Sequence, residues 1–276
     1  MAADMRGASR TFRVFISSTF EDFKEERNRL QAYMHADGWA SSAARQRFDT
    51  RFRHPRVVLP VIHAATESQV LASAEIARSA DADGVFLINH LGSCDQLFSM
   101  YAAARAHHSD WWIGINCLDL TPLELLAQVG EDVDGVWTDN AEVDERRDTQ
   151  PEAEAARRAA SDRGWAGLYF GGVAFKYQRP VPDLERAARL ARDYMDVITT
   201  SGPGTGQAAE PAKIAAIRTG GGDHSLALAS GVTPENVDGY LPWVDAYLVA
   251  TGISRDFEHL DPGRTRALVE RVHDRP

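Results

Sequence analysis

The stretch "ASGVTPENV" (residues 229–237) joins two kinds of sequence that together define a βα unit. The apolar run that leads into it stops at Ser230 and Gly231, and Thr233 followed by Pro234 is typical of a helix N-cap with proline in the first turn. Two small residues between a buried strand and a helix N-terminus let an anion approach the backbone. The stretch therefore predicts a strand, a tight turn and a helix.

Seven further apolar runs show the same design along the chain. Each is almost entirely apolar until its last two or three residues, as expected for a parallel strand that is covered on both faces. The eight runs are "RVVLPVIH" (56–63), "GVFLINH" (84–90), "WWIGINC" (111–117), "GVWTDN" (135–140), "GLYFGG" (167–172), "MDVITTSG" (195–202), "LALASG" (226–231) and "AYLVATG" (246–252).

Helix-patterned segments separate these runs. "TPLE" at residues 121–124 is a capping box with proline at the first helical position, and Asp261-Pro262 repeats the device before the last helix. Eight similar units in about 220 residues predict an α/β fold that closes into a (β/α)₈ TIM barrel, whose usual size is roughly 250 residues. An open doubly wound sheet is the alternative, but the lack of a long interruption favours closure.

The first 50 residues differ from the rest. "RTFRVFISSTFEDFKEERNRLQAYMHADG" (10–38) predicts one strand, a capping box from Ser18 to Glu21, and one amphipathic helix that ends at Gly38. Residues 40–55 are rich in Ser, Ala and Arg and have the composition of a basic connector. We therefore expect a βα appendage and connector over residues 1–50 and the barrel over residues 51–276.

The composition narrows the class of ligand and the compartment. A net charge of −10 argues against a nucleic-acid or anionic-lipid surface and favours a small ligand. Cys94 and Cys117 form no CxxC pair and no disulfide framework, so we expect separate structural cysteines and a reducing compartment. No apolar run approaches the roughly 18 residues of a membrane span, and the expected location is the cytoplasm.

Several motifs of the barrel region resemble the BtpA/SgcQ family of barrel proteins. They are "ADGVFLINH", "GIN", "DVITTSGPGTG", "ASGVTPENV", "VDAYLVATGIS" and "LDPGRTRALVERV", and together they cover most of residues 56–273. The resemblance implies a TIM barrel of bacterial origin and a link to photosystem I biogenesis in photosynthetic members. "FGGVAFKYQRPV" is similar to a distinct subgroup's fifth strand rather than to the commonest pattern of the family.

A second resemblance covers only about 25 residues at the front of the chain. "RVFISSTFEDFKEER" resembles the opening of a TIR-like domain of unknown function in bacterial signalling and defence proteins. A flavodoxin-like nucleotide site needs several βα units, whereas this chain turns into barrel sequence after one. We therefore interpret the segment as a docking or capping element through which residues 1–50 contact a protein partner.

Polar residues end nearly every predicted strand, where TIM barrels gather their active sites. Turn formation alone would also favour such residues. They are His63, Asn89, His90, Asn116, Asp139, Asn140, Lys176, Thr199 to Ser201, Ser230 and Thr251.

The loops after the last three strands are the predicted phosphate site. The loops after strands 7 and 8 often hold a phosphate in this fold. The glycine-rich "TTSGPGTGQ" (199–207), after strand 6, offers hydroxyls and N–H groups without a P-loop ending. The alternatives are tight βα turns and a mobile lid. The phosphate-binding candidates are Thr200, Ser201, Gly202, Thr205, Ser230, Gly231, Thr251 and Gly252.

Asp139 and Lys176 are the candidates for proton transfer, because barrel closure would bring their loops together at the mouth. An ordinary ion pair is the alternative, and Lys176 could also hold an anion or form a Schiff base. Asn89 and Asn116 are expected to orient the substrate. His63, His90 and Asp139 show no metal-ligand spacing, so we expect no metal, and nothing in the sequence indicates a cofactor.

Two functions fit these patterns. The first is an enzyme acting on a sugar phosphate or nucleoside phosphate, as a lyase, an isomerase or a glycosyl or phosphoribosyl transferase. The second is a non-catalytic assembly or regulatory factor that uses the barrel as a scaffold and residues 1–50 to recruit a partner. A homo-oligomer is compatible with either function.

Overall fold

The structure is a computed structural model that describes residues 43–274. The βα appendage and the TIR-like segment predicted for residues 10–38 lie outside the described residues. The described residues, 43–274, all belong to one compact unit.

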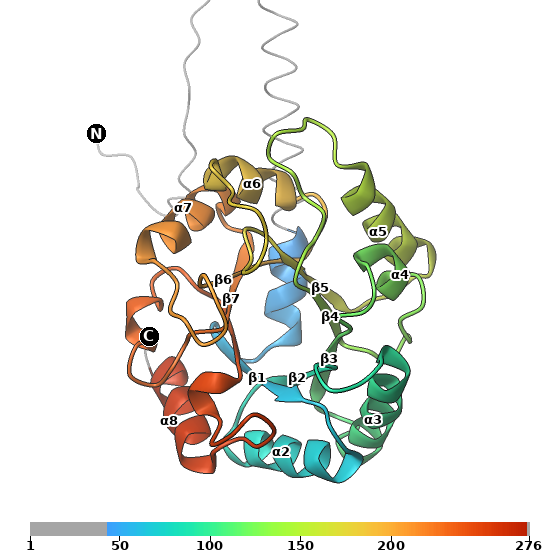
Figure 1. The fold of residues 1–276 in the computed structure, drawn as a ribbon, viewed down its shortest axis with the longest axis vertical. Helices are drawn as coiled ribbons and strands as arrows, with labels where there is room; N and C mark the ends of the chain where they lie inside the picture. The colour runs from blue at the N-terminus through green and yellow to red at the C-terminus, as the bar shows by residue number, and fades with distance from the viewer. Residues whose placement is uncertain (1–42, 275–276) are drawn as a thin grey trace, which may run out of the picture. The chain divides into compact units, whose positions relative to one another are not determined.

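Eight parallel strands close into a barrel in chain order, with β1 paired to both β2 and β8. This confirms the predicted closed barrel and excludes the open sheet. Figure 1 shows the ring of strands surrounded by helices. The strands are β1 (Val57–His63), β2 (Gly84–Ile88), β3 (Trp112–Asn116), β4 (Gly135–Thr138), β5 (Leu168–Gly172), β6 (Val197–Ser201), β7 (Ser225–Ala229) and β8 (Ala246–Val249).

Helices occupy most of the crossovers, and several begin with the caps expected from sequence. Thr121 and Glu124 form the predicted capping box, and Asp261 caps the last helix. The α-helices are α2 (Glu67–Ser79), α3 (Cys94–His107), α4 (Pro122–Leu126), α5 (Pro151–Asp162), α6 (Leu184–Ala191), α7 (Pro211–Gly221) and α8 (Pro262–His273). Short 3₁₀ helices, η2 (Val237–Gly239) and η3 (Thr251–Ile253), follow β7 and β8.

The expected helix after β7 is replaced by the 3₁₀ turn η2. Thr233 caps no α-helix: its hydroxyl accepts from Glu235 N, and its own N–H donates to Asn236 Oδ1. Gly239 and the nearby Pro242 explain the difference, because both residues disfavour an extended helix interior. The prediction of a helix N-terminus at this loop was wrong.

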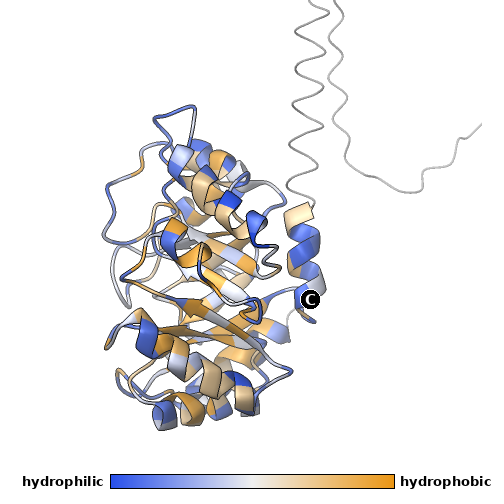
Figure 2. Ribbon diagram, turned by 90° about the vertical axis from the view of Figure 1, so that its right-hand side faces the viewer, coloured by the Kyte–Doolittle hydropathy of each residue, from blue (hydrophilic) through white to orange (hydrophobic). Residues whose placement is uncertain are grey.

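The strands separate two hydrophobic layers. Side chains that alternate along each strand, such as Val57, Leu59 and Val61 of β1, fill the barrel interior. The intervening residues, such as Val58 and Ile62, pack against the surrounding helices. Figure 2 shows hydrophobic colour concentrated on the strands, whereas the helices carry both hydrophobic and hydrophilic colour.

The described part of the expected basic connector is a helix over residues 43–51 that belongs to the barrel. Phe48 is fully buried and Phe52 is 8% exposed, and both pack against interior residues at the strand N-termini. Arg47 donates to Gly167 O, and Arg51 donates to Ala166 O at 2.7 Å. The basic residues are therefore contacts of this helix with the barrel rather than features of a linker. Figure 2 shows the helix at one end of the strands.

Four aspartates repeat at this N-terminal end of the barrel, one before each even-numbered strand. Each carboxylate accepts a backbone N–H from the first residues of the preceding strand, which fixes the register between neighbours. The pairs are Asp83 with Val58, Asp134 with Ile113, Asp196 with Tyr169, and Asp245 with Leu226. We call these four residues the aspartate ring.

No helix among residues 43–274 is long and apolar enough to cross a membrane.

Candidate active site

A cavity of about 110 Å³ opens at the C-terminal ends of the strands, on the face where TIM barrels place their active sites. Its wall combines titratable groups, hydroxyls and apolar side chains. The lining residues are Val61, His63, Ile88, His90, Trp137, Asp139, Lys176, Thr205, Ser230, Leu248, Ala250, Thr251 and Phe257. Five of the residues predicted from sequence for catalysis or phosphate binding therefore meet in one cavity: Asp139, Lys176, Thr205, Ser230 and Thr251.

Asp139 and Lys176 line this cavity without forming a salt bridge within residues 43–274. Burial raises the pKa of the Asp139 carboxyl, and it outweighs the opposing effects of the Asn116 hydrogen bond and the Lys176 charge. Asn116 Nδ2 donates to Asp139 Oδ1 at 3.0 Å. A carboxyl that is held by one neutral amide and faces a cavity is suited to exchanging a proton with a ligand.

Asp139 also borders a second cavity of about 300 Å³ between the loops that follow β3 and β4. Asp119 and Glu142 also line that space, so all of its charged side chains are acidic. The cationic side chain of Lys176 lines the mouth, on the other side of Asp139. An anionic ligand is therefore favoured in the mouth and disfavoured in the second cavity.

Two histidines form the opposite wall of the mouth. His63 Nδ1 lies 2.8 Å from Phe257 O, and the His63 and His90 rings meet edge to face at 4.9 Å. Burial lowers the pKa of His63 to about 4, with the charges of His90 and Lys176 acting in the same direction. Burial also lowers the pKa of His90, again with help from Lys176. Both imidazoles are therefore neutral near pH 7 and can act as donors or acceptors to a bound ligand.

The loop after β6 reaches across to its neighbours at the mouth. Lys176 Nζ donates to Thr205 Oγ1 at 3.3 Å, and Thr205 N donates to Tyr177 Oη at 3.2 Å. On the other side, Gly206 N donates to Ser230 Oγ at 3.0 Å. Two N–H groups that the sequence offered to a phosphate are thus held by hydroxyls of the chain, and one of these hydroxyls, that of Ser230, lines the mouth.

The glycines of these loops have a second role, which is close packing of one loop on another. A Cβ atom on Gly202 or on Gly231 would lie 2.0 Å from Gln207 O, and one on Gly252 would lie 1.8 Å from Val232 O. Ser230 and Gly231 also have φ values of 71° and 74°, which favour glycine. Gly231 is buried, and its N–H has no hydrogen-bond acceptor among the described residues.

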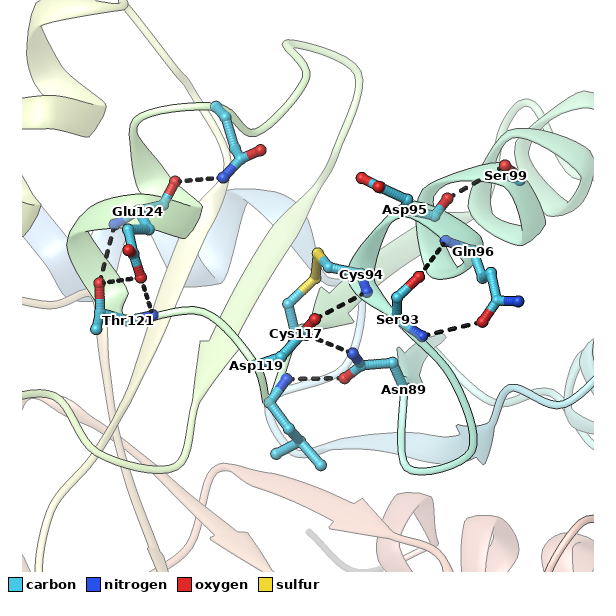
Figure 3. The surroundings of a disulfide bond; sticks show 12 residues. Asn89, Ser93, Cys94, Asp95, Gln96, Ser99, Cys117, Asp119, Thr121 and Glu124 are labelled. Carbon is cyan, nitrogen blue, oxygen red and sulfur yellow. Dashed lines mark hydrogen bonds between the residues drawn. A yellow bond between two sulfur atoms is a disulfide. The ribbon is translucent and has the colours of Figure 1, made fainter.

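Asn116 and Asn89, the two predicted orienting residues, have different surroundings. Asn116 holds Asp139 directly. Asn89 instead donates to Asp119 Oδ1 at 2.6 Å and accepts from Leu118 N at 2.7 Å (Figure 3). Asn89 is not among the residues that line the mouth and ties the loop after β2 to the loop after β3.

Cys94 and Cys117 form a disulfide beside this Asn89 network (Figure 3). The bond joins the first residue of α3 to the residue after β3, and Cys94 N donates to Asp119 Oδ2 at 3.2 Å. The expectation of separate cysteines was wrong, and the argument for a reducing compartment loses its basis. The 23-residue separation contains no pairing signal, whereas barrel closure brings the two Cα atoms to 5.4 Å.

Lys213 was missed by the sequence analysis. Its Nζ donates to Ala174 O at 2.5 Å and to Ser201 O at 2.6 Å, joining the ends of β5 and β6. Burial lowers the pKa of Lys213 to about 8. Because Lys176 N also donates to Ser201 Oγ at 2.8 Å, Lys213 anchors the segment that carries Lys176. Its place in the first turn of α7 resembles any surface lysine, so its sequence position carries no signal of this role.

Phe257 was missed as well, because it lies eight residues after β8, in a loop with no strand signal. It contacts the His63 ring at a centroid distance of 4.1 Å and is 52% exposed. Phe257 therefore supplies an apolar surface at the edge of the mouth.

Neither a protein-family model nor a curated protein sequence matches the chain. Solved structures share its fold at low identity. Phosphoribosyl anthranilate isomerase from Thermus thermophilus is 18% identical, with a TM-score of 0.55 over 79% of this chain and 98% of that one. Geranylgeranylglyceryl phosphate synthase from Thermoplasma acidophilum, in complex with sn-glycerol-1-phosphate, is 12% identical, with a TM-score of 0.57 over 81% and 95%. These likenesses show a TIM-barrel fold.

Proposed function

We propose that this protein is an enzyme that binds a small phosphorylated metabolite, a sugar phosphate or a nucleoside phosphate, at the C-terminal mouth of its barrel. The observation that carries the proposal is that one cavity contains the partly buried Asp139 carboxyl, the Lys176 ammonium and the hydroxyls of Thr205, Ser230 and Thr251. Lyase, isomerase and glycosyl or phosphoribosyl transferase reactions are the classes that this set of groups can serve.

The phosphate is assigned to the side of the mouth formed by the loops after β6, β7 and β8. Three hydroxyls line that side, the Gly231 N–H is free of acceptors in the described chain, and Lys176 reaches the same loop through Thr205. Hydroxyls, backbone N–H groups and an ammonium group are the usual ligands of a phosphate. By fold analogy, the complex of geranylgeranylglyceryl phosphate synthase with sn-glycerol-1-phosphate supports a phosphorylated ligand for this barrel.

Asp139 is assigned the proton transfer. Its raised pKa and the neutral Asn116 amide that holds it allow it to donate or accept a proton near the reacting atoms. Trp137 and Phe257 provide apolar surface for the organic part of the ligand, and His63 and His90 provide neutral hydrogen-bonding groups. The charged and apolar parts of the wall thus fit the two parts of a phosphorylated metabolite.

Calorimetric titration tests the assignment with inorganic phosphate and with a panel of phosphorylated sugars and nucleosides. We expect saturable binding to the parent protein and a loss of about tenfold or more in affinity for Lys176→Gln, because one charge-assisted contact to phosphate is removed. Arg158→Gln is the matched control, since Arg158 lies on α5 with Glu154 as its partner. Absence of binding in the parent, or an equal loss in the control, would remove the basis for the proposal.

A scaffold that recruits a partner, as the BtpA/SgcQ resemblance suggests, is the second candidate, and one observation favours it. Leu91, Leu118 and Leu123 are 52%, 40% and 44% exposed on the loop after β2, the loop after β3 and α4. The Asn89 contact to Leu118 N joins the first two of these loops. A partner-binding role predicts that Leu118→Ser abolishes capture of a partner while phosphate binding is retained, whereas the enzyme proposal predicts that Lys176→Gln abolishes turnover.

A further inference from the structure

The aspartate ring contains one exception that the proposed function does not use. Three of its carboxylates face guanidinium groups: Asp134 is paired with Arg105, Asp196 with Arg47, and Asp245 with Arg45 and Arg218. Asp83 faces two imidazoles instead, from His54 and His273. The aspartate before β2 is therefore paired with histidines, whereas the other three are paired with arginines.

The three side chains converge closely. His54 Nδ1 lies 2.7 Å from Asp83 Oδ1, and His273 Nε2 lies 3.0 Å from Asp83 Oδ2. Both nitrogens therefore contact the same carboxylate, and the two rings stack at a centroid distance of 3.7 Å. One nitrogen of each histidine and one oxygen of Asp83 all lie within 4.8 Å of one another.

The cluster is sheltered from solvent and held in place. The Asp83 side chain is 4% exposed and that of His273 is 11% exposed, while His54, at 26%, leaves one open side. The Val58 N–H donates to Asp83 Oδ2 at 2.8 Å and fixes the carboxylate. Hydrogen bonds of this kind orient the side chains that bind a metal ion.

We propose that His54, Asp83 and His273 bind a divalent transition-metal ion, with Zn²⁺ as the best fit. Two imidazole nitrogens and a carboxylate oxygen are zinc ligands at about 2.0 to 2.2 Å, and water completes a tetrahedron. Ligand atoms of such a site stand about 3.3 Å apart, so small side-chain rotations from the present 2.7 and 3.0 Å separations suffice. Each imidazole binds in its neutral form, with its remaining proton on the other ring nitrogen.

The site would connect the segment before the first strand with the last helix. His54 lies just before β1, Asp83 lies just before β2, and His273 is the last residue of α8. A metal ion at this point ties the first strand to the last helix, at the end of the barrel opposite the mouth. The expected role is therefore structural, which separates this inference from the proposed function.

Thermal unfolding of the metal-stripped full chain, with and without added Zn²⁺, tests the proposal. At a free Zn²⁺ concentration of about 100 times Kd, we expect the Tm of the parent protein to rise by about 5 °C or more and one equivalent of zinc to be retained after gel filtration. His54→Gln and His273→Gln are the test variants, because glutamine can still donate to Asp83 but is a poor zinc ligand. Both should lose the Tm response and the bound zinc.

Two further variants locate the ion. His259→Gln alters an exposed imidazole that lies 2.8 Å from a single carboxylate, that of Asp256, and should respond to zinc like the parent. His63→Asn removes a histidine of the mouth and should also keep the response. The proposal is overturned if the parent shows no response, if His54→Gln and His273→Gln respond like the parent, or if His63→Asn alone loses the response. Cobalt absorption in place of zinc provides a readout for a variant with lowered Tm.

Discussion

The two ends of the barrel differ in the partners that they give to partly buried carboxylates. At the N-terminal end, Asp245 accepts from Leu226 N and lies 2.8 Å from an Arg45 nitrogen and 2.5 Å from an Arg218 nitrogen. At the C-terminal end, Asp139 is held by a single neutral amide and no cation contacts it within residues 43–274. Paired charges stabilise a fold, whereas an unpaired buried carboxyl costs stability and remains free to exchange protons. The comparison therefore assigns stability to one end and chemistry to the other.

The largest expected difference between the two ends is in how much an aromatic side chain contributes to the free energy of unfolding. Phe48→Ala removes a fully buried ring at the N-terminal end and should lower the free energy of unfolding by about 3 to 5 kcal/mol. Phe257→Ala removes a ring that is 52% exposed at the mouth and should cost about 1 kcal/mol or less. Urea unfolding followed by circular dichroism measures both values. Equal losses would show that the two ends are not packed differently.

The Cys94–Cys117 disulfide is a covalent link at the C-terminal end of the barrel. Cys94→Ser should lower the free energy of unfolding by about 2 to 4 kcal/mol, because the unfolded chain regains the freedom of a 23-residue loop. Hydrogen exchange should rise in residues 89–121, around the Asn89 network, and stay unchanged in residues 43–58. A uniform rise along the chain would mean that the bond supports the whole barrel.

The two carboxylates can be compared directly by the same substitution. Asp245→Asn should lower the free energy of unfolding by about 2 to 3 kcal/mol, since two guanidinium groups lose their anion. Asp139→Asn should change it by about 1 kcal/mol or less, and turnover should be lost. Chemical unfolding at pH 7.5 checks both. A large loss of stability in Asp139→Asn would contradict the assignment of this carboxyl to chemistry.

The sign of the Asp139 effect depends on pH. The native pKa lies above the ordinary value of 3.8 because burial disfavours the charged form, so the native state holds the proton more tightly than the unfolded state. Its contribution to stability therefore falls as the pH rises from 3.8 to the native pKa and then stays low. The unfolding free energy of Asp139→Asn relative to the parent should accordingly increase over that interval.

Two histidines, one at each end of the barrel, allow a comparison by pH alone, without a substitution. Burial lowers the pKa of His63 at the mouth and of His224 before β7, in each case to about 4. The neutral form of each histidine favours the native state above pH 6.5, and this stability is lost as the pH falls from 6.5 to about 4. NMR titration should show both pKa values below 5, and saturating phosphate should raise only that of His63. An equal response of His224 would place the anion elsewhere.

The sequence predicted the parts of the molecule that depend on local pattern. Apolar runs with polar ends fixed all eight strands, and "TPLE" gave a capping box because the interaction spans three residues. Asp139 and Lys176 were placed at one mouth because strand order alone determines which strand ends are neighbours.

Features that depend on packing between distant segments were not predictable. Cys94 and Cys117 meet through loop geometry, and the helix over residues 43–51 seals the barrel through contacts with residues more than 100 positions away. Composition made that helix resemble a linker, since its arginines contact carbonyl and carboxylate groups that are remote in sequence. The role of Asn89 likewise depends on Asp119, which no pattern near Asn89 indicates.

A crystal structure of the full chain soaked with inorganic phosphate tests the central claim most directly. The account predicts a phosphate ion in the mouth, within hydrogen-bond distance of the hydroxyls of Ser230 and Thr251 and of Lys176 Nζ, with Asp139 facing the space beside it. A phosphate ion bound only elsewhere, or an empty mouth at saturating phosphate, would contradict it.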